Sequence, residues 1–339
     1  MQHILDHIWD IADLSPFQCL LWLSELVGRH PAINAWVVRT ISRWAETYLL
    51  AHDNQRVRSA ACSLFVHLVP ACQFPAAWKT WRVGHAPNRD LIASLSPEAV
   101  GVVQTLFRSL LRLLPQAKKY AEPAAHSANQ LVPYFSLLTF CLITKAEKLA
   151  WAEYFKEFWN LFYPEMCQSK IQQHLNKQAL LVFWYHACQD APENVAHMYR
   201  NKEVSQKLPF NYIMVDNDDP ELVAFNKLTL PAYYGLLRLA AQQNRFFLKT
   251  LSTHENIEWA FKNIAAHSSI YVNAAEELFV MMEMFAERPP APAPGASLAS
   301  LDNHQEERLR AAAFRQNTLS TFLNSYQKGQ WQTLITVRQ

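Results

Sequence analysis

The hydrophobic positions of this chain recur three or four residues apart, which is the spacing of amphipathic helices. Residues 3–14 show it first, with apolar side chains at Ile4, Leu5, Ile8, Ile11 and Ala12. Further helix starts are marked by capping residues and by proline, which has no N–H to leave unpaired at the first helical position. Such starts lie at Ser15 with Pro16, at Pro31, at Ser96 with Pro97, at Pro192, and at Asp219 with Pro220. The pattern predicts a succession of helices with short connections.

Residues 54–69 are the clearest repeat-like unit of the chain. Their apolar stripe contains a small pair that lets a neighbouring helix approach closely: Val57, Ala60, Ala61, Leu64 and Leu68. The order of a polar cap, Val-Arg, small residues and leucines is similar to the second helix of HEAT and armadillo units. Such repeats bury their faces only against neighbours. We therefore predict an all-α, armadillo/HEAT-like helical repeat superhelix, with a compact irregular α domain as the alternative.

Further helices are predicted from the same spacing. They cover residues 97–115, 129–143, 145–162, 169–189, 192–204, 244–252, 255–265, 269–286 and 303–326, with separate helices starting at Pro220 and Pro231. Residues 74–95 suggest a short helix and a loop. Residues 179–185 are apolar on every face, as a buried strand would be. The helical spacing of Ile171, Leu175 and Ala179 favours a helix with neighbours on both sides instead.

The composition changes at residues 288–297, whose sequence RPPAPAPGAS cannot pack a core. We predict a helical repeat array over residues 1–287 and a Pro/Ala-rich linker over residues 288–302. Residues 303–339 are predicted to be the truncated start of a further helical unit. The chain ends on WQTLITVRQ, an apolar start without a finish, which suggests a piece of something longer.

Composition narrows the class of protein. Of the 339 residues 50% are hydrophobic and only six are glycine, which disfavours Rossmann, P-loop and β-sandwich folds. A net charge of +2 provides no field to attract nucleic acid or an anionic membrane. Neither a secretory signal nor an apolar segment of membrane length is visible. We expect a soluble intracellular protein, cytoplasmic and/or nuclear, with no small-molecule substrate.

The cysteine–histidine pairs of the sequence do not have the spacing that a catalytic pair or a zinc site needs. Cys188 follows His186 by two positions, and residues two apart on a helix point to different faces. Cys62 and His67 could form one zinc-ligand pair, but no second pair accompanies them. The six cysteines form no CxxC motif, and most lie in apolar helical patterns, as small buried hydrophobes do. We predict no catalytic, cofactor-binding or metal-binding residues.

Charged runs receive a structural interpretation. An acidic run, Asp216 to Asp219, resembles a calcium loop but lacks the glycine and glutamate that an EF-hand needs. We predict that Asp219 caps the helix starting at Pro220, with a contact to a basic partner as the alternative. Two basic pairs are predicted to be solvated faces and not nucleic-acid contacts: Arg56 with Arg58, and Lys118 with Lys119.

A surplus of aromatic residues is the remaining candidate. Seven of them crowd one predicted helix: Trp151, Tyr154, Phe155, Phe158, Trp159, Phe162 and Tyr163. Most must be core, and the alternative is that one or two are exposed anchors for a partner. Met281, Met282 and Met284 could form an adaptable surface, although core filling is the simpler reading.

A family resemblance is carried by residues 208–285. Its segments are LPFNYIMVDNDD (208–219), Phe225 with Asn226, LPAYYGLLRL (230–239), HENIEWAFKNI (254–264) and AAEELFVMMEMF (274–285), with WQTLI (331–335) beyond them. These resemble the helical region beyond the catalytic domain of the large ubiquitin-specific proteases. In that family the region is an armadillo-type array flanking the protease.

The resemblance implies a scaffold and no bond chemistry in this chain. The family's protease domain needs a cysteine box of the type GLxNLGNTCYMN and a histidine box near GHY, and neither occurs here. We expect an interaction scaffold that positions ubiquitinated substrates or adaptors. One alternative is a piece that carries or completes the family's ubiquitin-cleaving activity. Another is a transport or assembly adaptor that shares only the helical architecture.

Overall fold

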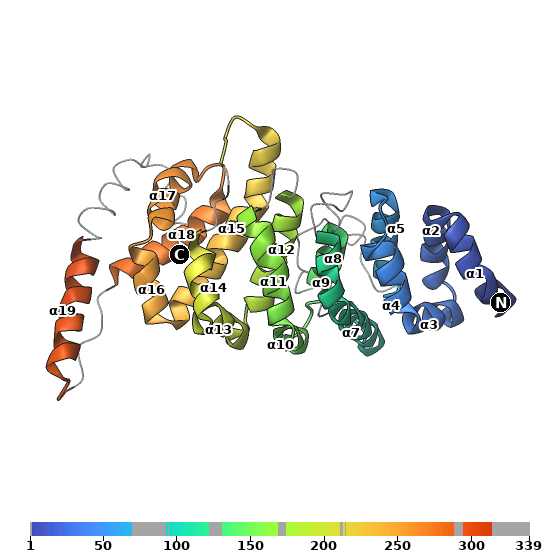
Figure 1. The fold of residues 1–339 in the computed structure, drawn as a ribbon, viewed down its shortest axis with the longest axis horizontal. Helices are drawn as coiled ribbons and strands as arrows, with labels where there is room; N and C mark the ends of the chain where they lie inside the picture. The colour runs from blue at the N-terminus through green and yellow to red at the C-terminus, as the bar shows by residue number, and fades with distance from the viewer. Residues whose placement is uncertain are drawn as a thin grey trace. The chain divides into compact units, whose positions relative to one another are not determined.

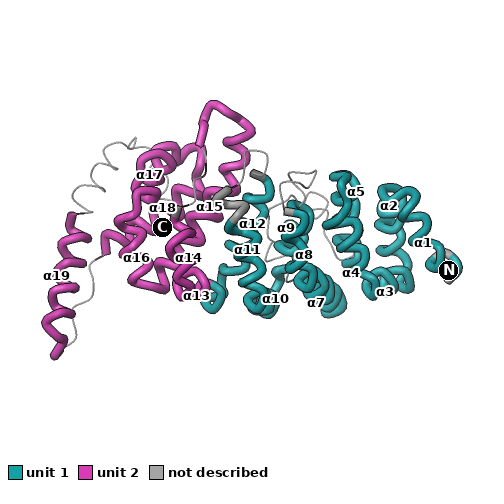
Figure 2. Tube along the Cα trace, in the orientation of Figure 1, with its two compact units in different colours: residues 1–194 teal, residues 195–339 magenta. Residues whose placement is uncertain are grey.

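The structure is a computed structural model, and it describes residues 2–69, 93, 95–121, 131–168, 174–210, 213, 215–287 and 294–313. These residues form helices and connecting loops, and no strand occurs among them (Figure 1). The predicted all-α class is therefore confirmed. The chain divides into two compact units, residues 1–194 and residues 195–339 (Figure 2).

The helices of unit 1 pack in chain order. They are α1 (Gln2–Leu14), α2 (Pro16–Val27), α3 (Pro31–Arg39), α4 (Ile41–Trp44), the π-helix η1 (Ala45–Leu50), α5 (Gln55–His67), α7 (Pro97–Arg112), α8 (Leu114–Ala121), α9 (Val132–Phe140), α10 (Lys145–Ala152), α11 (Phe155–Gln168) and α12 (His174–Cys188). In one row α2 packs on α5, α5 on α9, and α9 on α12. In another, α3 and α4 pack on α7, and α7 packs on α10. Contacts that pass from one helix to the next are compatible with stacked repeats. The superhelix itself remains a prediction.

α5 uses its predicted stripe as the core face. Asn54 caps the helix, because its side-chain oxygen accepts a hydrogen bond from the N–H of Arg56 at 2.8 Å. The whole predicted stripe is buried: Val57, Ala60, Ala61, Leu64 and Leu68. Local spacing was therefore enough to identify the buried face of this helix.

Arg58 corrects the sequence prediction of a solvated basic pair. Arg56 is exposed, but Arg58 is 0% exposed. Its Nη1 donates to the carbonyl oxygens of His52 and Asp53, each at 2.9 Å. The guanidinium thus satisfies the backbone of the loop that enters α5, and burial lowers its pKa. Lys118 and Lys119 are both exposed, as predicted.

The aromatic-rich stretch forms two helices, α10 and α11, and the prediction of one helix over residues 145–162 was wrong. A tight turn separates them, in which the N–H of Tyr154 donates to the carbonyl of Trp151 at 2.8 Å. The offset lets Trp151 meet both Phe158 and Phe183, with ring centroids 5.1 and 5.6 Å apart. These are edge-on contacts, the favoured geometry for aromatic pairs. The predicted helical state of residues 179–185 is confirmed, since they lie within α12.

Unit 2 is organised around one long helix. Its elements are α14 (Lys202–Lys207), the 3-10 helix η5 (Leu208–Phe210), α15 (Pro220–Gln243), α16 (Arg245–Ser252), α17 (Glu255–Asn263), the 3-10 helix η6 (Ala265–His267), α18 (Val272–Ala286) and α19 (Leu298–Ala313). α13 (Pro192–Arg200) crosses from unit 1 into unit 2. α15 packs along α18, and α18 also contacts α16 and α19. An ion pair with largely buried side chains joins Arg238 of α15 to Glu277 of α18.

The separate helices expected to start at Pro220 and Pro231 are one helix. Pro231 lies inside α15, where it removes one backbone hydrogen bond. The residues around it are buried, including Leu230, Ala232 and Tyr233. Packing against α18 holds this helix together across the proline, so tertiary contacts override the local stop signal.

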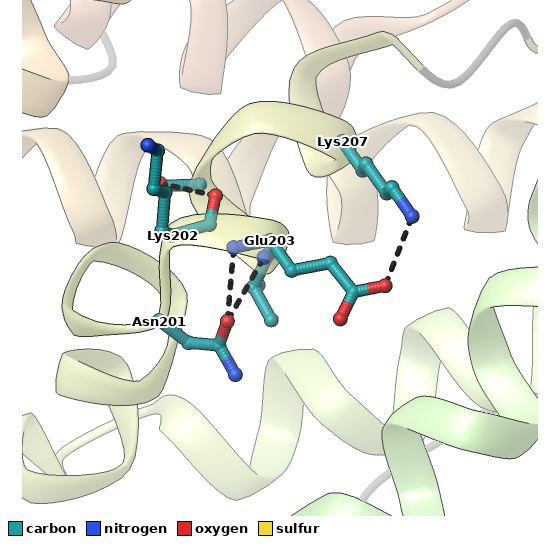
Figure 3. A network of polar contacts seen from close by, with 6 residues as sticks. Asn201, Lys202, Glu203 and Lys207 are labelled. Atoms are coloured by element: carbon teal, nitrogen blue, oxygen red, sulfur yellow. Dashed lines mark hydrogen bonds and ion pairs between the residues drawn. The ribbon is translucent and has the colours of Figure 1, made fainter.

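The helix expected over residues 192–204 is divided at Asn201 (Figure 3). α13 ends at Arg200, and the Asn201 side-chain oxygen accepts from the N–H groups of Glu203 and Val204 at 3.0 and 3.4 Å. An ion pair of 2.9 Å between Lys207 and Glu203 then spans one turn of α14. Asparagine therefore restarts the chain as a second helix.

Several sequence predictions fall on residues outside the description. These include the helix and loop at 74–95, apart from residues 93 and 95, part of the linker at 288–302, and everything after residue 313. The described part of the C-terminal region shows α19 beginning at Leu298, before the expected residue 303. The Oγ of Ser297 accepts a hydrogen bond from the N–H of Ser300 at 3.3 Å, which makes Ser297 its cap.

Candidate interaction surface

Four of the six cysteines lie in environments that keep the thiol protonated. Cys19, Cys141 and Cys188 are buried. Burial raises the pKa of Cys19 to about 11 and that of Cys62 to about 12, and it also raises the pKa of Cys141 and Cys188. Because only the thiolate is a good nucleophile, these four thiols are poorly suited to nucleophilic catalysis. Of the predicted alternatives, the core interpretation is the one that this geometry supports.

The histidines paired with cysteine in the sequence have other partners. Nδ1 of His186 lies 2.8 Å from Oε1 of Gln189, and Nδ1 of His67 lies 2.7 Å from the carbonyl oxygen of Ser63. No group of three histidine, cysteine or carboxylate side chains that could hold a metal ion occurs among the described residues. Neither sequence pair is therefore assembled into a recognisable catalytic or zinc site.

The acidic run at residues 216–219 is a capping structure. Oδ1 of Asp219 accepts from the N–H groups of Glu221 and Leu222 at 2.9 and 3.3 Å, so the predicted cap of the helix starting at Pro220 is confirmed. Oδ1 of Asp216 accepts from the N–H of Asp218 at 3.0 Å. A carboxylate at this helix end also meets the positive end of the dipole.

The stretch carrying the family resemblance is fastened internally by buried polar groups. The hydroxyl of Tyr233 donates to the carbonyl of Leu208 at 2.9 Å, and Nδ2 of Asn256 donates to the carbonyl of Pro209 at 2.7 Å. The hydroxyl of Tyr271 donates to Oδ1 of Asn217 at 2.8 Å. These bonds hold the segment before α15 against α15, α17 and α18. The segments that carry the resemblance therefore have a clear structural role.

The predicted aromatic and methionine anchors are mostly core. Trp151, Phe155, Phe158, Trp159, Phe162, Met281 and Met282 are all buried, which confirms the core reading for them. Tyr154, Tyr163 and Met284 are half-buried. None of these side chains is exposed.

A tryptophan cluster in unit 1 is the strongest candidate for contact with another protein. Trp9 of α1 is half-buried and stacks on the buried Trp44 of α4, with ring centroids 4.2 Å apart. Trp36 of α3 is also half-buried and lies 5.7 Å from Trp9 between centroids. The guanidinium carbon of Arg43 lies 3.7 Å from the centroid of Trp9. Tryptophan and arginine are among the side chains enriched at the hot spots of protein interfaces.

Hydrogen bonds and the π-helix η1 hold the buried side of the cluster in place. Nε1 of Trp44 donates to the hydroxyl of Thr40 at 3.1 Å. The chain then enters η1, a π-helix, an element that frequently occurs at functional sites. Tyr48 of η1 continues the ring contacts from Trp44 at 5.4 Å and donates to Oδ1 of Asp13 at 3.3 Å. Burial, followed by the charge of Asp13, raises the pKa of Tyr48 to about 12, so its hydroxyl remains a donor.

Sequence reasoning did not find this cluster. The helix start predicted at Pro31 is confirmed, but the residues that follow it form three elements, α3, α4 and η1. Trp9 comes from α1, so the cluster exists only after the helices pack. A possible signal was the spacing of Trp36, Thr40, Trp44 and Tyr48, four residues apart each time, which places their side chains along one helical face.

Comparison with known proteins identifies relatives over nearly the whole chain. Human ubiquitin carboxyl-terminal hydrolase 34 is 41% identical over 336 residues, 98% of this chain. The chain corresponds to a region of the large ubiquitin-specific proteases. The mouse protein of the same name is also 41% identical, and the Drosophila melanogaster ubiquitin carboxyl-terminal hydrolase puf is 38% identical over 338 residues. The resemblance drawn from the sequence is confirmed.

The match covers a small part of each relative. The chain spans 9% of the human and mouse proteins and 8% of the fly protein. No protein-family model matches the chain, and no solved structure matches it. Among the described helices of this ubiquitin-specific protease region, none is both long and apolar enough to cross a membrane.

Proposed function

We propose that this region is a protein-interaction scaffold of a ubiquitin-specific protease, which positions ubiquitinated substrates or adaptors and performs no bond chemistry itself. The proposal rests on one combined observation: the relationship of the chain to ubiquitin hydrolases and the buried surroundings of its cysteine thiols. The chain is related to ubiquitin hydrolases over 98% of its length, yet four of its six cysteines, Cys19, Cys62, Cys141 and Cys188, sit where burial keeps the thiol protonated. The absence of the family's cysteine and histidine boxes from the sequence supports the same reading.

A fluorogenic ubiquitin substrate tests the absence of chemistry. The purified chain is expected to release no fluorophore above the buffer rate. Turnover that disappears when a single cysteine is replaced would overturn the scaffold proposal. It would favour instead a piece that carries ubiquitin-cleaving activity.

Proximity labelling tests the scaffold role. The chain, fused to a labelling enzyme in cells, is expected to enrich ubiquitinated proteins or ubiquitin-pathway adaptors over a matched fusion of an unrelated helical protein. Enrichment confined to proteins outside the ubiquitin pathway contradicts the proposal and favours a transport or assembly adaptor.

A further inference from the structure

The outer face of Trp9 shows what kind of group it accepts. Trp44 stacks on Trp9 at 4.2 Å, and the guanidinium carbon of Arg43 lies 3.7 Å from the same ring centroid. Two groups at stacking distance from one ring must take opposite faces. The inner face of Trp9 is therefore filled by the core, and its outer face holds a cation.

We propose that the outer face of Trp9 is a binding site for an arginine or lysine side chain in a basic segment of a partner protein. Arg43 occupies this site when no partner is bound. The inference rests on the proposed scaffold function and names the class of partner that this part of the scaffold takes.

The charge of α1 favours a basic partner. This helix carries three aspartates and neither lysine nor arginine. Asp6, Asp10 and Asp13 are all exposed and lie on one side of the helix, because they are spaced by four and then three residues. Trp9 borders that side. The aspartates attract a basic peptide and repel nucleic acid and anionic membranes, so a protein segment is the partner that fits.

Arg43 is suited to be displaced. Its side chain is exposed, and a single cation–π contact at an exposed site is weak. A basic segment that reaches both the ring of Trp9 and the aspartates of α1 makes contacts that Arg43 alone does not make. Arg43 therefore acts as an internal competitor and lowers the apparent affinity for the partner.

The test compares two arginines of the same region. Arg39 of α3 is exposed like Arg43, but among the described residues its side chain makes no contact with the Trp9 ring. Calorimetric titration would use a short peptide with two arginines separated by glycine, and the same peptide with citrulline in place of arginine. The proteins would be the full chain, Arg43→Gln and Arg39→Gln, at one ionic strength. Both substitutions remove one positive charge.

We expect Arg43→Gln to bind the arginine peptide about three to ten times more tightly than the unchanged chain, since the internal competitor is gone. Arg39→Gln is expected to change the affinity by less than about twofold, because it removes only distant repulsion. The citrulline peptide is expected not to bind. Trp9→Leu, with helicity checked by circular dichroism, is expected to weaken binding of the arginine peptide.

Three outcomes would overturn the inference. Equal tightening in Arg43→Gln and Arg39→Gln would show general electrostatics, and equal binding of the citrulline peptide would show an apolar surface without cation selection. No binding of the arginine peptide to Arg43→Gln would remove the site altogether. In each case the proximity-labelling result stands by itself, so failure of this site is distinguishable from failure of the scaffold proposal.

Discussion

At the scale of single residues, buried polar side chains bind the backbone of loops. Arg58 satisfies two carbonyls before α5, and Asn256 satisfies the carbonyl of Pro209 before α15. An unpaired carbonyl in the interior costs roughly 1–3 kcal/mol, so each of these side chains stabilises a loop conformation as well as a helix. Replacing one of these side chains is expected to destabilise the loop that it binds as well as its own helix.

Arg58→Met is expected to destabilise the protein by roughly 2–4 kcal/mol, because methionine keeps much of the apolar stem but leaves the carbonyls of His52 and Asp53 unpaired. Urea denaturation followed by circular dichroism measures the change in the free energy of unfolding. Arg56→Gln is the matched control, since Arg56 is exposed, and should stay within about 0.5 kcal/mol. Equal effects of the two substitutions would contradict the role given to Arg58.

His254 gives a prediction about pH. Its Nδ1 accepts a hydrogen bond from the N–H of Asn256 at 3.2 Å, as the cap of α17, and burial lowers its pKa. The unfolded chain takes up this proton near pH 6.5, whereas the folded chain takes it up only at lower pH. The contribution of His254 to stability is thus complete above about pH 6.5 and is lost as the pH falls below it.

His254→Asn is the matched variant, because asparagine caps a helix without titrating. Between pH 7.5 and 5.5, the free energy of unfolding is expected to fall more for the unchanged chain than for His254→Asn. His197, whose pKa burial also lowers, is present in both proteins and cancels in the comparison. An identical pH dependence in the two proteins would contradict a half-buried His254 that stays neutral in the folded chain.

At the scale of elements, helix starts were predictable and helix continuity was not. Ser96 and Asp219 cap helices as their sequence context predicts, because a cap depends on the residues within one turn. Pro231 did not end α15, since buried neighbours outweigh one missing hydrogen bond. Arg58 lies three residues before Ala61, at the edge of the buried stripe, and only its contacts with the preceding loop settle its burial.

Asp219→Ala is expected to destabilise unit 2 by about 1 kcal/mol, because it removes the acceptor of two N–H groups at the start of α15. Amide hydrogen exchange would show the loss as faster exchange in the first turn of that helix. Asp218→Ala removes the same charge one residue earlier, where the side chain is exposed, and should leave this turn nearly unchanged. Faster exchange in both variants would attribute the effect to charge and not to the cap.

At the scale of the whole molecule, the all-α class and the family relationship followed from the sequence, whereas the tryptophan cluster did not. The fold class can be predicted from the spacing of hydrophobic residues, because every helix of the chain shows that spacing. The cluster depends on α1, α3 and α4 meeting, and no local pattern encodes which faces meet. Trp9 looked like any residue of an amphipathic helix until Trp44 and Arg43 took its two faces.

The predicted armadillo/HEAT-like array has a consequence for size that the compact alternative does not share. A compact globule of 339 residues has a radius of gyration of roughly 20 Å. In a repeat array each helix is covered by elements near it in the array, as α5 is by α2, η1 and α9, so added length extends the molecule instead of thickening it. Small-angle scattering of a monomeric sample is therefore expected to give a clearly larger value. A folded monomer at about 20 Å would contradict the array and support the compact irregular α domain, because burying the same helices in a globule requires contacts between rows far apart in the chain.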